Sequence, residues 1–411
     1  MTWEFLKVRH RRSVIAAAGA VAAATAASAA VLAANAGAAG AADVPILTTV
    51  PYTAAAGSDG ALTRPDGVAA AGGTVYVSNA GDSVVAALSG GSTAIIAGSL
   101  ENFGEHGDGG PATAATLYHP GGTAVDGTGD VFIADAGDNV VREITASGVI
   151  KRIAGTGSAR GPLNSPRATS ASLDYPEGVA VDASGDVFIA DTFNNRVVEV
   201  TPSGSMRAVA GTGKAGYSGD GHSAQHASLS TPTGVAVDAA GDVFIADASN
   251  NVVRRVAART GIITTVAGDF AAGRASDGLG GFSGDGGPAT AAQLNDPQGV
   301  AVDGAGDVFI ADTFNNAIRE VTPDGKISTV VNAAPAAGGI PPAGRESSGK
   351  AATASQLNTP YAVTVDAAGD LFIADTKNNA IAEVTGLAQP AGSASPSASA
   401  SATSSASAST S

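Results

Sequence analysis

The chain has 411 residues, with 37 Asp and Glu against 22 Lys and Arg, and its formal net charge is −15. It contains no cysteine, which excludes disulfide frameworks, thiolate metal sites and cysteine nucleophiles. The acidic balance argues against a nucleic-acid ligand, because binding to a phosphate backbone depends on clustered Lys and Arg.

The N-terminal segment predicts export. Residues 4–12 are basic, residues 14–32 form an uncharged Ala-rich stretch, and residues 39–41 fit an A-x-A cleavage site. These features predict a signal peptide over residues 1–41 and a secreted, extracellular protein with no membrane anchor after cleavage. The pair Arg11-Arg12 leaves the export route open between Sec and twin-arginine.

The middle of the chain is one sequence repeated six times, and each copy starts at a proline: Pro65, Pro120, Pro176, Pro232, Pro297 and Pro360. Each complete copy contains four short segments rich in Val, Ile and Phe, separated by turn signals such as A-S-G-D, T-F-N-N and T-P-S-G. This pattern predicts four antiparallel strands per repeat. Because both faces of each sheet are largely apolar, the sheets must cover one another. We therefore predict an all-β fold, a six-bladed β-propeller over residues 42–387.

The ends of the repeat array predict how the ring closes. The sixth repeat stops after its third strand, near Val384, so its blade lacks an outer strand. Residues 46–50 (ILTTV) precede the first repeat and match the fourth strand at 262–266 (IITTV). We expect residues 46–50 to complete blade six and remove the open sheet edge. Residues 388–411 are uncharged and rich in Ser and Ala, which predicts a disordered tail.

The motif GVAVD-x-x-GD-VFIAD-T-x-NN resembles the NHL-repeat family over residues 43–386. The match is specific in repeats two to six and weak in repeat one, and the His of the family's N-H-R-I turn is replaced by Asn. The resemblance implies the propeller fold. The family includes secreted bacterial propellers, sensor domains of receptor kinases, RNA-binding domains and an amidating lyase, so the resemblance does not imply one function.

An acidic residue ends the second strand of five repeats: Asp135, Asp191, Asp247, Asp312 and Asp375. A ring of carboxylates is compatible with cation sites. Their recurrence favours a structural interpretation, in which each Asp accepts hydrogen bonds from backbone N–H groups of the following turn. The two Asn residues of that turn then supply the left-handed backbone.

The connections between blades share two features. A leucine lies three residues before every repeat proline and predicts a packing plug: Leu62, Leu117, Leu173, Leu229, Leu294 and Leu357. Gly-Asp-Gly units centred on Asp108, Asp220 and Asp285 are interpreted as tight turns, because they lack the alternating oxygen ligands of a calcium loop.

The histidines of these connections, His106, His119, His222 and His226, are interpreted as solvated loop residues. A zinc site would need about three of them to converge across the axis. We therefore expect no cofactor, with calcium and zinc as the alternatives.

The sequence contains no G-x-S-x-G nucleophile elbow and no P-loop, and its positive charges (Arg142, Arg254-Arg255 and Arg319 among them) look scattered. We predict a non-catalytic, monomeric binding scaffold for an extracellular protein, a glycan or a cell-wall component. The alternative is an extracytoplasmic metal-dependent lyase or hydrolase with its site at the propeller mouth.

In a propeller, the turns between second and third strands open on the same face as the connections between blades. That face carries the variable segments, and binding residues concentrate on such loops. The candidate ligand-face residues are Phe193, Phe314, Tyr217, Phe270, Phe282, Asn194 and Asn315. The alternative for the aromatic rings is that they cover the blade tops as packing.

Overall fold

The structure, a computed structural model, describes residues 45–52, 62–99, 103–159, 165–275, 280–333, 341–344, 349–385 and 387. These residues all lie in Val44–Ser411, the second of two compact units of the chain. The predicted signal peptide and C-terminal tail lie outside the described residues. Within the described ranges, none of the helices combines the length and the apolar character needed to cross a membrane.

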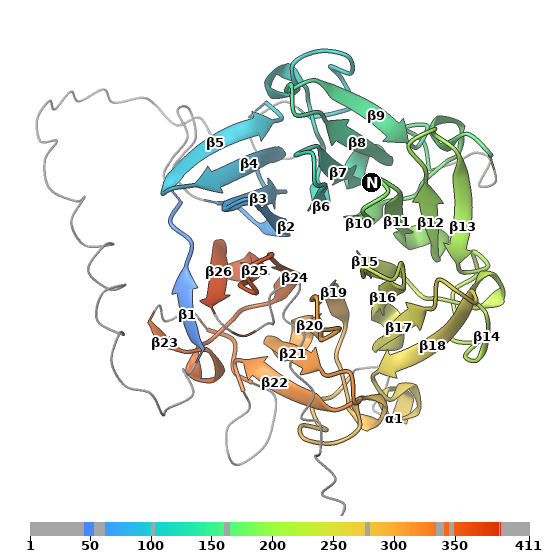
Figure 1. Ribbon diagram of the computed structural model, residues 1–411, viewed down its shortest axis with the longest axis vertical. Helices are drawn as coiled ribbons and strands as arrows, with labels where there is room; N and C mark the ends of the chain where they lie inside the picture. Colours follow the sequence, from blue (N-terminus) through green and yellow to red (C-terminus); the bar gives the residue numbers. More distant parts are fainter. Residues whose placement is uncertain are drawn as a thin grey trace, which may run out of the picture. The chain divides into compact units, whose positions relative to one another are not determined.

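Six antiparallel sheets surround a common centre, and the first strand of each repeat is the innermost (Figure 1). Blades one to three consist of β2 (Pro65–Ala71), β3 (Thr74–Asn79), β4 (Val84–Ser89) and β5 (Ser92–Ala97); β6 (Pro120–Val125), β7 (Val131–Asp135), β8 (Val140–Ile144) and β9 (Ile150–Ala154); and β10 (Pro176–Val181), β11 (Val187–Asp191), β12 (Arg196–Val200) and β13 (Met206–Ala210).

Blades four to six consist of β15 (Pro232–Val237), β16 (Val243–Asp247), β17 (Val252–Val256) and β18 (Ile262–Ala267), with β14 (His222–Ser223) at the edge; β19 (Pro297–Val302), β20 (Val308–Asp312), β21 (Ala317–Val321) and β22 (Ile327–Val331); and β24 (Pro360–Val365), β25 (Leu371–Asp375), β26 (Ala380–Thr385), β1 (Ile46–Thr49) and β23 (Lys350–Ala351). The predicted six-bladed β-propeller is confirmed.

The ring closes through β1, which lies beside β26 although the two strands stand at opposite ends of the described chain (Figure 1). Leu47 pairs with Val384, and the side chain of Leu47 is fully buried. The predicted closure by the N-terminal strand is therefore confirmed. Strand β23 pairs with the other edge of β1, so the closing strand has a hydrogen-bonded neighbour on each side.

Short 3-10 helices occur at two recurring places, and one α-helix, α1 (Phe270–Ala275), is present in the described chain. One group lies in the connections: η1 (Ala112–Ala114), η3 (Ala168–Ser170), η5 (Ala224–His226), η7 (Ala289–Ala291) and η9 (Ala352–Ala354). The other group follows the second strands: η2 (Ala136–Asp138), η4 (Thr192–Asn194), η6 (Ala248–Asn250), η8 (Thr313–Asn315) and η10 (Thr376–Asn378). The six connection leucines are buried, as the packing-plug prediction requires.

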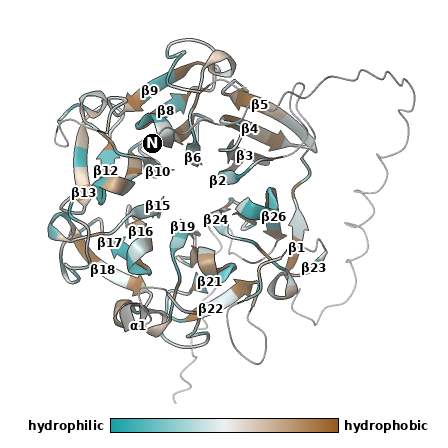
Figure 2. Ribbon diagram, turned by 180° about the vertical axis from the view of Figure 1, so that it is seen from behind, coloured by the Kyte–Doolittle hydropathy of each residue, from teal (hydrophilic) through white to brown (hydrophobic). Residues whose placement is uncertain are grey.

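The core lies between neighbouring blades. Every residue of the second strands of blades two to six is buried, so these V-F-I-A-D segments pack on both faces. Figure 2 shows hydrophobic and hydrophilic stretches along the outer strands β9, β13 and β18, which have one face toward solvent. Continuous packing around the ring gives a rigid support for the loops at its two ends.

Candidate functional site

The aspartates that end the second strands hold the connections in place. The carboxylate of Asp247 accepts the backbone N–H of Ser230 at 2.7 Å and the side-chain amide of Asn250 at 2.8 Å. The backbone donor lies 17 residues before the aspartate, and the same spacing recurs at Asp135, Asp191, Asp312 and Asp375. The structural interpretation is correct, but the predicted donors were wrong. The connection entering the blade supplies the N–H, because it passes directly over the strand end.

The second Asn of each turn joins one blade to the next. Asn195 adopts a left-handed backbone (φ 50°), and its side-chain oxygen accepts the N–H of Thr231 at 3.0 Å. Four further Asn residues make the same bond to the residue preceding the next repeat proline: Asn139, Asn251, Asn316 and Asn379. Only the second Asn is left-handed, whereas the first lies in the 3-10 turn and donates to the aspartate in blades three to six.

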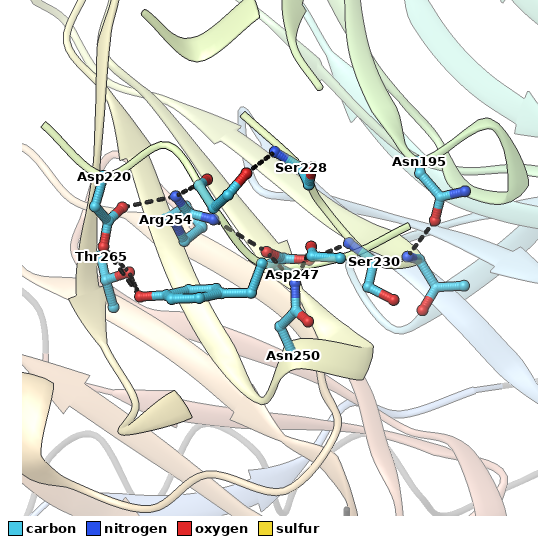
Figure 3. Close-up of polar contacts among 12 residues, drawn as sticks. Asn195, Asp220, Ser228, Ser230, Asp247, Asn250, Arg254 and Thr265 are labelled. Carbon is cyan, nitrogen blue, oxygen red and sulfur yellow. Dashed lines mark hydrogen bonds and ion pairs between the residues drawn. The ribbon is translucent and has the colours of Figure 1, made fainter. Parts of the chain in front are cut away.

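Three arginines that looked scattered in the sequence are fully buried at matching positions of the third strand: Arg142, Arg254 and Arg319. In Figure 3, Arg254 lies between Asp220 and Asp247. Its Nη2 donates to Asp220 at 2.6 Å, and its Nη1 donates to Asp247 at 3.4 Å. The aspartate of the Gly-Asp-Gly turn is thus the outer partner of a buried arginine.

This Asp–Arg–Asp link recurs in blades two, four and five. Arg142 joins Asp108 to Asp135, and Arg319 joins Asp285 to Asp312. Blades three and six have Val198 and Ala382 at the arginine position, and their connections lack the Gly-Asp-Gly unit. Because the third-strand arginine and the Gly-Asp-Gly unit occur in the same repeats, the sequence contained a signal that they are in contact.

The innermost strands contain an irregularity at the residue after each repeat proline. In β10 the pairing with β11 shifts between Pro176 and Gly178, so Glu177 is a bulged residue outside the ladder. Gly178 is required there, because a Cβ atom on it would lie 2.2 Å from the carbonyl oxygen of Thr233 in the next blade. Equivalent register shifts occur in all six blades. Bulges redirect side chains, and they are frequent beside functional sites.

These bulges surround a central cavity of about 80 Å³ at the end of the channel where the connections enter. Its rim consists of residues on either side of the repeat prolines: Arg64, Asp66, His119, Gly121, Tyr175, Glu177, Thr233, Gln298 and Tyr361. We call these nine the rim residues. Below them the inner strands contribute valines, among them Val68, Val179 and Val300. The other end of the channel is lined mainly by Val and Ala.

The rim is electrostatically unbalanced. Burial raises the pKa of the Asp66 carboxyl to about 6, although the Arg64 guanidinium lies 3.0 Å away and lowers it. Burial, with the negative charges of Asp66 and Asp296, raises the pKa of Glu177 to about 7. Burial and the charge of Arg64 lower the pKa of His119. Perturbed carboxyl groups gathered around a cavity are typical of functional sites.

Three buried polar atoms of the rim have no hydrogen-bond partner in the described protein: Oδ1 of Asp66, Nδ1 of His119 and Oε1 of Gln298. The Gln298 amide is oriented by its Nε2, which donates to Asp296 at 2.8 Å. Buried polar groups without partners are rare in folded proteins and need an explanation. Across the described ranges, no three His, Asp or Glu side chains are arranged to hold a metal ion.

The predicted ligand-face residues lie outside the rim, in two kinds of setting. Phe193 and Phe314 are about half exposed, and Phe193 stacks on the rim residue Tyr175 with 5.2 Å between ring centroids. Tyr217 stacks on Phe270 and lies over the Arg254 guanidinium, as Phe282 lies over that of Arg319. Asn194 and Asn315 each donate to the aspartate of their own turn.

Sequence reasoning missed the rim, although a signal was present. Repeats two to six share the V-D-x-x-G-D and F-I-A-D strings, yet the residue after the proline is different in every repeat: Asp66, Gly121, Glu177, Thr233, Gln298 and Tyr361. His119, which was assigned to a solvated loop, is partly buried at the cavity. Because a different residue is accepted at this position in every blade, the fold does not require any one side chain there.

Two family models match the chain: the Teneurin NHL domain over residues 202–277 and 280–348, and the NHL repeat over residues 173–199. Human Teneurin-4 is 32% identical over 230 residues, which cover 52% of this chain and 8% of the teneurin. Mouse Teneurin-3 is 30% identical over 236 residues, with 53% and 8% covered. The chain therefore spans about a twelfth of the length of these relatives.

Two solved structures from Bacteroides thetaiotaomicron share the fold. One is a structural genomics protein of unknown function, with a TM-score of 0.59, 16% identity and coverage of 83% of this chain and 75% of the other. The second is an auxiliary nutrient binding protein, with a TM-score of 0.57, 12% identity and coverage of 83% and 76%. With its six repeats, its closed ring of blades and these matches, the chain belongs to the NHL-repeat family of six-bladed β-propellers.

Proposed function

We propose that this propeller is a secreted, non-catalytic binding protein and that its ligand is recognised at the rim of the central cavity. The observation that carries the proposal is that the rim combines residues that differ from blade to blade with buried oxygen atoms that have no hydrogen-bond partner in the described protein. The residues after the repeat prolines differ in every blade, and Asp66 and Gln298 each bury an oxygen without a partner in the described protein. A concave site with a few convergent polar groups is the usual form of a small-ligand site.

The partner that we propose is an extracellular protein or carbohydrate, bound by a monomeric propeller. The basic and Ala-rich features of residues 1–41 support export. The auxiliary nutrient binding protein of similar fold is compatible with a binding role outside the cytoplasm. A cavity of about 80 Å³ admits only a compact group, so a large partner would insert a side chain or a terminal sugar while its remainder lies on the surrounding loops.

A lyase or hydrolase remains the second candidate because of two carboxyl groups. The raised pKa values of Asp66 and Glu177, about 6 and about 7, are those of groups that exchange protons near neutral pH. In such an enzyme these two residues, rather than a metal, would act as acid and base.

The test is an array of glycans and extracellular peptides probed with the purified protein and two sets of variants. The rim set is Glu177→Gln and Gln298→Met, and the outer set is Phe314→Ala and Ser203→Ala. We expect the rim variants to lose the recognised ligand and the outer variants to retain it. Retention by both rim variants, with unchanged melting temperatures, would contradict the proposal. Conversion of the recognised ligand to product would establish the enzyme instead.

A further inference from the structure

Two acidic residues line the cavity, Asp66 and Glu177, and a third, Asp296, lies close enough to act on Glu177. Asp66 belongs to blade one, Glu177 to blade three, and Asp296 immediately precedes blade five. Their mutual repulsion contributes to the raised pKa of Glu177. The cations that face this cluster from the surrounding elements are Arg64, which is bound to Asp66, and His119, whose pKa is lowered and which is therefore neutral at pH 7. The site thus has more negative than positive groups.

The acceptors do not come from the acidic cluster alone. Gln298 is an uncharged residue that is about nine-tenths buried; it lines the cavity, and its Oε1 has no hydrogen-bond partner among the described residues. Its Nε2 is already committed to Asp296, so the group that it offers to a ligand is an acceptor. Oδ1 of the equally buried Asp66 is a second acceptor without a partner. Glu177, another lining residue, adds a carboxylate. The cavity therefore presents acceptors from blades one, three and five.

The remaining surfaces are aromatic and apolar. Tyr361 and Tyr175 line the rim, and the valines of the inner strands form the floor. A primary ammonium has three N–H donors and no acceptor, and aromatic faces attract such a cation. A divalent metal ion would instead need several anionic ligands converging on one point, which the described residues do not supply.

We propose that the central cavity binds a primary alkylammonium group, with Asp66, Glu177 and Gln298 accepting its three hydrogen bonds. The inference rests on the proposed function, because it names the ligand class of the same cavity. Lysine side chains and free diamines both carry this group. Arg64 acts as an internal competitor, because its guanidinium already neutralises part of the acidic cluster.

Binding should strengthen as the pH rises. The carboxyl groups of Asp66 and Glu177 must be ionised to bind a cation, and their pKa values in the free protein are about 6 and about 7. The groups that face Glu177 and set this range are Asp66, Asp296 and Arg64, with Tyr175 and Tyr361 alongside. Affinity for an ammonium ligand should therefore increase from pH 5 to pH 8 and then level off.

The experiment is titration calorimetry of the purified protein with cadaverine and with Nα-acetyl-lysine methylamide, which separate a free diamine from a peptide lysine. We expect Glu177→Gln and Asp66→Asn to weaken binding by about 10- to 100-fold, because each removes a charged acceptor. Arg64→Gln should strengthen binding. Asp324→Asn makes the same charge change in an exposed turn at the opposite end of the blades and should have no effect.

The Nε-acetylated lysine derivative is the neutral control. Equal binding of that derivative, or unchanged affinity in Glu177→Gln, would overturn the inference, as would stoichiometric Ca²⁺ or Mg²⁺ that excludes cadaverine. If no amine binds while rim variants still abolish recognition on the array, the ammonium inference fails and the proposed function stands. If no amine binds and the rim variants change nothing on the array, both fail. Thermal melting of each variant excludes unfolding as the cause of a loss.

Discussion

Two sets of buried carboxyl groups in this propeller differ in their hydrogen-bond partners. Asp247 is fully buried, and burial raises its pKa to about 6, but it accepts bonds from Ser230, Asn250 and Arg254. Asp66 is about as perturbed and lies at the cavity, yet one of its oxygens has no partner in the described protein. Groups of the propeller itself donate hydrogen bonds to the first set, so its role is structural. The second set supports the proposed ligand site, because a carboxylate oxygen beside the cavity has no partner among the described residues.

The repeats support this distinction. The strand-end aspartates recur in five blades with the same backbone partner, as expected if every blade needs that link. The rim residues do not recur: one blade has Glu177 where the next has Thr233. A link that every blade needs recurs around the ring, whereas the position after the proline holds a different residue in all six blades and is not fixed by the fold.

The largest effect should come from removing a buried arginine. Arg254→Met leaves Asp247 buried beside an apolar side chain, and breaking such a pair costs about 3–5 kcal/mol of unfolding free energy. The neighbouring Arg255→Met is the control: Arg255 pairs with Asp242 and is about half exposed, so its loss should cost less than about 1 kcal/mol. Urea denaturation of both variants measures the difference.

A second variant separates lost charge pairing from lost packing. Arg254→Met combined with Asp247→Asn removes both charges, while the remaining amide oxygen still accepts the Ser230 N–H. The double variant should recover more than half of the lost stability. Equal costs for Arg254→Met and Arg255→Met would mean that the buried set is no more structural than a surface pair.

The next effect concerns closure, because the rim keeps its geometry only while the ring stays closed. Leu47 is fully buried in β1, whereas its neighbour Ile46 is 43% exposed. Leu47→Ala should cost about 2–5 kcal/mol through the cavity it leaves. Ile46→Ala should cost less than about 1 kcal/mol because it faces solvent. Calorimetric melting measures both, and similar shifts would show that β1 contributes little to closure.

The fold was predictable because its determinants repeat. The six repeat prolines, the six leucines and the matching strings 46–50 and 262–266 predicted the blade number and the closing strand. The partners of the aspartates were not predictable by looking forward along the chain, because the donor lies 17 residues earlier. The arginine links could have been predicted from the sequence. A third-strand arginine such as Arg254 and a Gly-Asp-Gly turn such as that at Asp220 are both present in blades two, four and five, and both are missing from blades three and six.

The candidate site was harder to predict because its residues are far apart in sequence. Asp66, Glu177 and Gln298 line one cavity only in the closed ring, and the bulges at these positions leave no sequence signal beyond the Pro-x-Gly string. Sequence reasoning looked to the long connections, where differences in length are easy to see. The single-residue differences beside the prolines are smaller, but they face the axis.

A third expected result concerns pH. Glu177 has a folded-state pKa of about 7 against an ordinary value of 4.5, so the folded protein holds its proton more tightly than the unfolded chain. Its contribution to stability is therefore favourable at low pH and is lost as the pH rises from 4.5 to 7. Glu177→Gln should reduce this loss by on the order of 1–2 kcal/mol, a value discounted for partial solvent exposure.

Urea midpoints at pH 4.5 and pH 7 check the expectation, with Asp324→Asn as the surface control. If the urea midpoint of Glu177→Gln changed with pH as much as that of the wild type, groups of the protein itself would already stabilise the ionised carboxylate. The rim would then resemble the strand-end aspartates, and the reason for assigning it to a ligand would be lost.

The smallest effect is expected from two phenylalanines in matching Thr-Phe-Asn-Asn turns. Phe193 and Phe314 are exposed to nearly the same extent, 54% and 52%, but only Phe193 has a described stacking contact with a rim residue, Tyr175. Phe193→Ala should free the Tyr175 ring and weaken cadaverine binding by about two- to fivefold, the range of a single aromatic contact. Phe314→Ala should leave the affinity unchanged, because its turn lies in blade five without that stack. Calorimetric titration at pH 8 compares the two variants. Equal losses would extend the binding surface from the rim to the outer turns, whereas no loss in either variant would confine it to the cavity.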